Sequence, residues 1–118
     1  VPQPRGPFCH GVEANGFLFI SGQGPYNPAT GDFERGTISR QTELTLACIE
    51  RILEEAGLTR KDVVQCRVYL QPLDSQNFQA MNEVYSRFFG DHTPARATVG
   101  TQLLHIDVEI ECVARRPV

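Results

Sequence analysis

The chain has 118 residues, of which 41% are hydrophobic and 21% are charged, and its formal net charge is −3. This mixture is typical of a globular protein and excludes a disordered or fibrous chain. The negative charge argues against a nucleic-acid partner, because a phosphate backbone is bound by clustered Lys and Arg. No apolar run is longer than that of Phe17–Ile20, so no membrane-spanning segment is predicted.

The length suits one compact domain over residues 1–118. The four cysteines include no CxxC pair, and they therefore predict no zinc site. Cys48, Cys66 and Cys112 each fall on the apolar side of a predicted element, and we expect them to be small core side chains. We see no secretion signal, and the thiols favour a reducing compartment, so the expected location is the cytoplasm.

An Asn15–Gly16 turn divides the first two predicted strands, at about Phe8–Glu13 and Phe17–Gly22. Asn-Gly is a strong hairpin signal because both central residues of such a turn must reach positive φ angles. Residues 23–37 contain several Gly and Pro residues, and they are predicted to form a structured loop.

Apolar and small residues recur at steps of three and four from about Ser39 to Ala56, which predicts a helix. Gly57 is well suited to end that helix in the left-handed conformation. Strict alternation over Val63–Leu70 predicts a half-buried strand.

A second helix is predicted to start at Asp74 or Ser75, either of which can cap its N-terminus, and to end at Gly90. The last two strands are expected at about Ala95–Thr101 and Ile106–Ala114.

Two helices can cover only one face of such a sheet, so the predicted fold class is α+β with the helices on one side. The other face is predicted to be mixed, with Phe17, Gln65, Arg67, Tyr69, Asp107, Glu109, Glu111 and Val113. Such a face is either solvated or covered by other subunits. Small domains often need the additional burial that association with other subunits provides.

Four short motifs follow one another along the chain. They are Ser21-Gly22-Gln23, Asn82-x-x-Tyr85-x-x-Phe88-Phe89, Pro94-Ala95-Arg96 and Glu109-Ile110-Glu111. In this order and at these separations, they resemble the RidA/YjgF family of reactive-intermediate deaminases. The resemblance extends from Gly6 to Ala114 and therefore covers nearly the whole chain.

The resemblance implies a chorismate-mutase-like α+β fold that assembles as a homotrimer, with ligand clefts between subunits. It also implies hydrolysis of 2-iminopropanoate and 2-iminobutanoate to 2-keto acids and ammonia, with neither a cofactor nor a metal ion. The implied partners are a small imine that carries a carboxylate and further copies of the same chain.

Two residues carry the implied chemistry. Arg96 falls on the family's carboxylate-binding arginine, and a guanidinium offers a planar fork of donors that matches a carboxylate. Glu109 falls on the family's water-handling glutamate, and a carboxylate can take the proton of a water that adds to the imine carbon. Without the resemblance, a surface arginine and one solvated acidic strand face would be the simpler interpretations.

Three further residues match the lining of the family's pocket. Ser21 matches a serine in the pocket, and Gly22 allows the backbone to approach a ligand closely. Asn82 matches an asparagine at the pocket edge. Without the resemblance, Ser21 and Gly22 would be interpreted as turn residues, and Asn82 as an amide that packs its helix. Gln41 is expected to be a structural contact rather than a ligand group.

The sequence departs from the family pattern in three places. Phe8 replaces a pocket tyrosine, so a hydroxyl worth about 0.5–1.5 kcal/mol in an ordinary hydrogen bond is missing. Thr98 replaces a cysteine found in many members. The loop Gln102–His105 is also shorter than in typical deaminases, and substrate preference is therefore expected to differ.

Several alternatives to a 2-imino acid deaminase remain open at this stage. The substrate could instead be 2-aminomuconate or an aminoacrylate species, as in some family relatives. A second alternative is a trimer that binds small carboxylates without turnover. Ribonuclease activity, which has been attributed to some relatives, is the least favoured because the chain is acidic.

Overall fold

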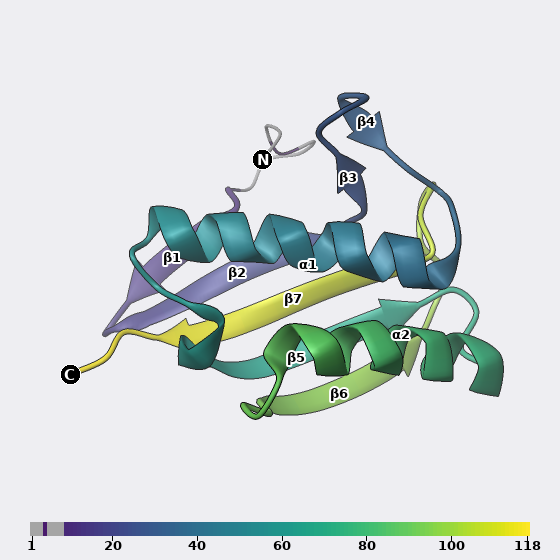
Figure 1. The fold of residues 1–118 in the computed structure, drawn as a ribbon. Helices are drawn as coiled ribbons and strands as arrows, with labels where there is room; N and C mark the ends of the chain where they lie inside the picture. Colours follow the sequence, from purple (N-terminus) through teal and green to yellow (C-terminus); the bar gives the residue numbers. More distant parts are fainter. Residues whose placement is uncertain (1–3, 5–8) are drawn as a thin grey trace.

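The computed structural model describes residue 4 and residues 9–118. The predicted start of the first strand and the predicted ligand contact of Phe8 lie outside these residues. Within them, five strands form one mixed sheet, and two helices pack on one face of that sheet (Figure 1). The predicted α+β class with helices on one side is confirmed.

The elements follow the predicted order, with short additions. The strands are β1 (Gly11–Ala14), β2 (Phe17–Gln23), β3 (Tyr26–Asn27), β4 (Asp32–Phe33), β5 (Val63–Leu70), β6 (Ala95–Gly100) and β7 (Val108–Arg115). The helices are α1 (Ile38–Glu55), the 3₁₀ turn η1 (Arg60–Asp62) and α2 (Ser75–Phe89). The sheet order is β1-β2-β7-β5-β6. Among the strand pairs of residues 9–118, only β5 and β6 run parallel, as the crossover through α2 requires.

The first hairpin turns at Asn15 and Gly16, whose φ angles are 52° and 81°. Both values are positive, as the Asn-Gly signal predicts. The turn fixes the register of β1 on β2, in which Ala14 lies opposite Phe17.

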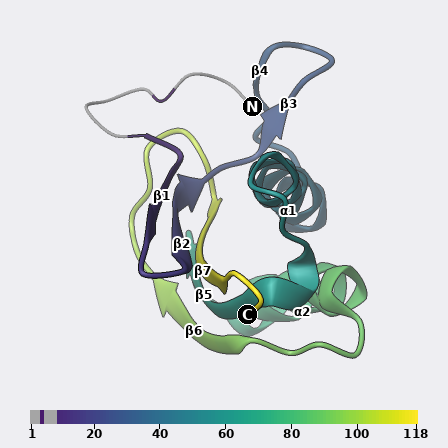
Figure 2. The same ribbon diagram turned by 90° about the vertical axis from the view of Figure 1, so that its left-hand side faces the viewer.

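The prediction of a loop over residues 23–37 is only partly right. β3 pairs with β4, and the rings of Tyr26 and Phe33 lie 6.1 Å apart between centroids. The Asn27 side chain closes this hairpin, accepting from the Ala29 N–H at 2.8 Å and donating to Glu34 at 2.8 Å. Strands of two residues are too short to show alternation, which explains why the sequence does not reveal them. The hairpin stands apart from the main sheet (Figures 1 and 2).

Helix α1 begins where the Thr37 side chain accepts a hydrogen bond from the Arg40 N–H at 3.1 Å. Gly57 follows the helix with a φ of 74°, as predicted. Gln41 is fully buried and donates to the Gly36 carbonyl at 2.8 Å, while its Oε1 accepts from the Asp107 N–H at 2.9 Å. The expectation that Gln41 is a structural contact is confirmed.

The last strand starts later than predicted, at Val108 rather than Ile106. Asp107 therefore does not lie on the open sheet face, and that part of the prediction is wrong. Its carboxylate instead accepts from Arg35 at 2.9 Å and from Gln41 at 3.0 Å. The Arg35 guanidinium, more than any other neighbour, lowers the pKa of Asp107. This network ties the loop before β7 to the start of α1.

Strand β7 separates the two faces of the sheet. Its residues Val108, Ile110, Cys112 and Ala114 are buried under the helices, while the residues between them point to the opposite face. Figure 2 shows both helices on the same side of the strands. Cys48, Cys66 and Cys112 are all buried and free, as expected of core thiols.

Candidate active site

Arg96 projects from the edge strand β6 towards helix α2. In the parallel register it lies beside Cys66, whose side chain is buried under the helices. The guanidinium carbon is 4.8 Å from the ring centroid of Tyr85 and 5.6 Å from that of Phe78. Its Nη1 lies 3.8 Å from the Met81 sulfur. Among residues 4 and 9–118, no carboxylate forms an ion pair with Arg96.

Two other predicted residues lie on the same side of the sheet as Arg96. Thr98 is two residues further along β6, opposite the buried Val68. Asn82 lies on α2 between Phe78 and Tyr85 in the i, i+4 and i, i+3 relationships that share a helix face. Its Oδ1 is buried and has no hydrogen-bond partner in the described part of the chain. A buried amide oxygen without a hydrogen bond costs folding free energy, and a ligand that donates a hydrogen bond to it would remove that cost.

Glu109 lies on the opposite face of the sheet. It pairs in register with Tyr69, and its carboxylate rests against the backbone of Gly22. A Cβ atom at Gly22 would lie 2.5 Å from the Glu109 Oε2, so a larger residue at this position would force the Glu109 side chain to shift. Burial raises the pKa of the Glu109 carboxyl, and the nearby charge of Glu111 adds to that effect.

Ser21 and Gly22 occupy an irregularity of β2, where the register on β7 shifts between Ile20 and Gln23. The Ser21 hydroxyl donates to the Cys9 carbonyl at 2.6 Å. Its own lone pairs stay available to accept a hydrogen bond. The irregularity thus places Gly22 of β2 against the Glu109 side chain of β7.

The neighbouring Glu111 has a different environment. It accepts hydrogen bonds from the Tyr69 hydroxyl and from Arg67, the latter at 3.3 Å. Glu109 has no hydrogen-bond partner among the residues that the structure describes. An acidic side chain of a solvated strand face is therefore a better description of Glu111 than of Glu109.

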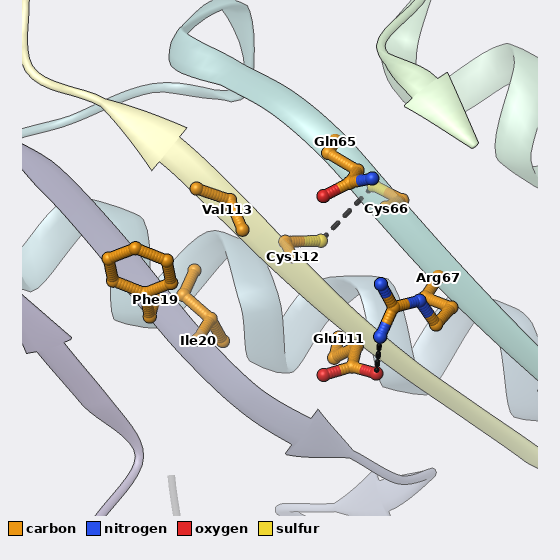
Figure 3. A pocket seen from close by; sticks show the side chains of 8 residues that line it. All are labelled: Phe19, Ile20, Gln65, Cys66, Arg67, Glu111, Cys112 and Val113. Atoms are coloured by element: carbon orange, nitrogen blue, oxygen red, sulfur yellow. Dashed lines mark hydrogen bonds and ion pairs between the residues drawn. The ribbon is translucent and has the colours of Figure 1, made fainter. Parts of the chain in front are cut away.

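A hollow of about 250 Å³ opens on the helix-free face beside these acidic residues (Figure 3). Its lining combines polar and apolar groups from three strands, namely Phe19, Ile20, Gln65, Cys66, Arg67, Glu111, Cys112 and Val113. The Phe19 side chain is 48% exposed at its edge. The mixed character predicted for this face is present, although neither Arg96 nor Glu109 lines the hollow.

Arg96 and Glu109 do not meet within one chain. Along the sheet they are three register steps and two strands apart, which places their Cα atoms roughly 14 Å from each other. Their side chains also leave opposite faces. The carboxylate and imine carbon of a 2-imino acid are bonded to each other, so one such molecule cannot reach both groups of the same chain.

The described residues contain no group of three or more His, Cys, Asp or Glu side chains arranged to hold a metal ion. They also contain no helix of the length and apolar character needed to cross a membrane.

Known proteins resemble this chain over almost its full length. A family model described as Endoribonuclease L-PSP matches residues 1–116. A RutC family protein of Pyrococcus horikoshii is 44% identical over 116 residues, covering 97% of this chain and 90% of that protein. The mitochondrial protein MMF1 of Saccharomyces cerevisiae is 33% identical, covering 97% of this chain and 78% of that protein.

Solved structures agree with this relationship. A structure from Thermotoga maritima has a TM-score of 0.90 and 40% identity, covering 99% of this chain and 92% of that one. The structure of E. coli TdcF with bound serine has a TM-score of 0.88 and 32% identity, covering 98% of this chain and 93% of that one. The chain therefore belongs to the RidA/YjgF family, whose model carries the description Endoribonuclease L-PSP.

Proposed function

We propose that this protein hydrolyses small 2-imino acids to 2-keto acids and ammonia, at a site shared between two copies of the chain. The observation that carries the proposal is the presence of two charged groups at the candidate site that have no oppositely charged partner in the described part of the chain. Arg96 has no carboxylate partner and Glu109 has no hydrogen-bond partner among the described residues. Charged side chains that are partly buried and unpaired are costly, and they often mark functional sites.

Arg96 is suited to hold the substrate carboxylate. Its guanidinium keeps nearly all of its donors free, because the Met81 sulfur is only a weak acceptor. A carboxylate can then bind the planar fork through two parallel hydrogen bonds. The bound serine of E. coli TdcF is a small molecule with a carboxylate next to a nitrogen-bearing carbon, and it illustrates the class of ligand that we propose.

Glu109 is suited to handle the proton of the attacking water. The water oxygen adds to the carbon of the protonated imine while one water proton passes to the carboxylate and the C=N electron pair moves to nitrogen, giving a neutral tetrahedral carbinolamine. The carboxyl then returns its proton to the amine nitrogen. The C–N bond breaks as the hydroxyl gives its proton to the carboxylate, and ammonia leaves as the keto acid forms. The raised pKa of Glu109 brings it closer to the value that serves both as base and as acid near neutral pH.

The two groups require a second copy of the chain. They leave opposite faces of one sheet, so a single substrate can meet both only where Arg96 of one copy approaches Glu109 of another. The half-exposed Phe19 and the hollow beside Glu111 give the helix-free face a shape that a neighbouring copy can cover. We propose a cyclic homotrimer, since a ring repeats the same heterologous contact in every interface.

A ribonuclease function, which the description of the family model suggests, has less support. The chain is acidic, and five arginines of the described region are engaged with carboxylates: Arg35, Arg40, Arg60, Arg67 and Arg116. A continuous basic track for a phosphate backbone is not formed by these residues. We propose the cytoplasm as the compartment, although the relative MMF1 is a mitochondrial protein.

The proposal is tested by forming 2-iminopropanoate in situ from alanine with an amino-acid oxidase and following its decay. Wild-type protein at micromolar concentration should accelerate the decay. Arg96→Ala and Glu109→Gln should each lower kcat/KM by about a hundredfold or more, since each removes a charged contact to the reacting molecule. Arg116→Ala is the matched control, because Arg116 pairs with Glu13 beside the first hairpin. No acceleration by the wild type would reject the proposal.

A further inference from the structure

Arg96 contacts two aromatic rings and has no carboxylate partner among the described residues. Its guanidinium carbon lies 4.8 Å from the Tyr85 centroid and 5.6 Å from the Phe78 centroid, within the range of cation–π attraction. The five arginines with ion pairs in the described region instead contact Asp or Glu. Arg60 also lies over a ring, 4.1 Å from the Phe88 centroid, but it is paired with Glu50 as well. Arg115 lies 6.0 Å from the Phe17 centroid. Arg96 is distinguished by contacting two rings while it has no carboxylate partner among the described residues.

Tyr85 is the fixed part of this arrangement. Its side chain is buried, and its ring lies 4.7 Å from that of Phe89, which in turn meets Phe88 edge-on at 4.9 Å. Three rings packed in this way leave Tyr85 little freedom to move. Phe78, by contrast, is 37% exposed and forms the outer side of the arrangement.

The ring of Tyr85 matters for this contact, and its hydroxyl does not. Tyr85 Oη is buried without a hydrogen-bond partner among the described residues, so it accepts no hydrogen bond from Arg96. The π face attracts the cation without accepting its N–H groups. A carboxylate in the same place would consume those donors and neutralise the charge.

We propose that Tyr85, with Phe78 at its outer side, is a positioning residue that orients the Arg96 guanidinium for a ligand carboxylate. This inference rests on the proposed function, in which Arg96 binds the substrate. The ring plane restricts the guanidinium to a few orientations, and the fork reaches the ligand with less loss of rotational freedom. The effect is expected in ligand affinity and KM, with little change in kcat.

The first test compares binding of 2-oxobutanoate and of its neutral amide, 2-oxobutanamide, by calorimetry. Tyr85→Leu should weaken keto-acid binding by about threefold to thirtyfold, and Tyr85→Phe should restore it. Binding of the amide should change little in either variant. Equal weakening of both ligands would mean that Tyr85 merely shapes the cavity, and unchanged keto-acid affinity in a folded Tyr85→Leu protein would also overturn the inference.

The second test needs no ligand. A guanidinium over a ring has its N–H proton resonances moved upfield by the ring current, and the Arg96 signals can be assigned by their loss in Arg96→Lys. They should be upfield in the wild type and in Tyr85→Phe, and return to ordinary positions in Tyr85→Leu. If Tyr85→Leu does not fold, Phe78→Leu at the exposed side should give the same changes to a smaller extent. Arg96 N–H chemical shifts that stay the same in these variants as in the wild type would reject the positioning role.

These outcomes are separable from a failure of the proposed function. If wild-type protein shows no imine hydrolysis, but Tyr85→Leu still releases the Arg96 resonances and weakens keto-acid binding, the positioning role stands and the catalytic proposal fails. If hydrolysis is lost in Arg96→Ala but Tyr85→Leu has wild-type KM, the catalytic proposal stands and the positioning role fails.

Discussion

Arg96 and Glu109 leave opposite faces of the same five-stranded sheet, Arg96 towards helix α2 and Glu109 towards the helix-free face. This relationship decides how the candidate site can work. A substrate of three or four carbons spans neither the thickness of the sheet nor the distance across β5, which lies between the two residues. The chemistry that the two residues suggest together is therefore proposed to need two copies of the chain.

Gly22→Ala tests the contact between the backbone of β2 and the proposed base. The new Cβ would lie 2.5 Å from the Glu109 Oε2, so the carboxylate must move. Because a displacement of about 1 Å at a reacting group can cost up to a hundredfold in rate, kcat should fall by about tenfold to a hundredfold. Steady-state kinetics with 2-iminopropanoate measures the effect.

The matched control is Gly36→Ala, whose Cβ would lie 3.2 Å from a carboxylate oxygen of Glu34. Glu34 has no place in the proposed site, so this variant should keep the wild-type rate. A Gly22→Ala protein with unchanged kcat would show that the position of Glu109 is unimportant for the reaction.

Glu111→Gln should move the acidic limb of the kcat/KM profile to lower pH. The proposed base must be ionised, so activity falls as the pH drops through the raised pKa of Glu109. Removing the charge of Glu111 lowers that pKa, and activity then survives to lower pH.

Glu13→Gln serves as the control for this profile. Glu13 binds Arg116 at 2.7 Å in an exposed pair beside the first hairpin, so its removal should leave the limb in place. A limb that does not move in Glu111→Gln would mean that another group limits the reaction at low pH.

Glu109→Gln should stabilise the protein at neutral pH. The folded-state pKa of Glu109 is raised above its unfolded value, so the folded protein binds more protons in the window between the two values. Stability is therefore lost as pH rises through that window, and the full cost is present above it. Glutamine cannot ionise and removes this cost.

Thermal unfolding at pH 7 should give a higher Tm for Glu109→Gln than for the wild type, and the difference should shrink below about pH 4. Glu111→Gln is the comparison, because it removes the ion pair with Arg67 and gains no such relief. Equal or lower stability of Glu109→Gln at pH 7 would indicate that this carboxylate is not held in an unfavourable environment.

The fold follows from local signals where each signal fixes a backbone conformation. Asn15–Gly16, the cap at Asp74 and the alternation of Val63–Leu70 locate their turn, helix and strand to within a residue or two. The β3–β4 hairpin is missed because its strands are only two residues long. Asp107 is placed wrongly because its long-range bonds to Arg35 and Gln41 draw it out of the strand.

The candidate site is predictable only in part. The family resemblance identifies Arg96, Glu109, Ser21, Gly22 and Asn82, but it does not reveal how one chain arranges them. Alternation alone does not place Arg96 and Glu109 on opposite faces, since that depends on the register of β5 with both of its neighbours. The contact of Tyr85 with Arg96 is likewise hidden in the sequence, where Tyr85 reads only as part of an apolar helix stripe.

Subunit complementation tests the shared site most directly. Arg96→Ala and Glu109→Gln proteins, each inactive alone, are unfolded together in equal amounts and refolded into mixed oligomers, whose composition is checked by native mass spectrometry. If each site takes Arg96 from one copy and Glu109 from its neighbour, random mixing leaves both groups intact in about one quarter of the sites. The mixture should then recover about that fraction of wild-type imine hydrolysis. Mixed oligomers that stay inactive would contradict a site shared between copies.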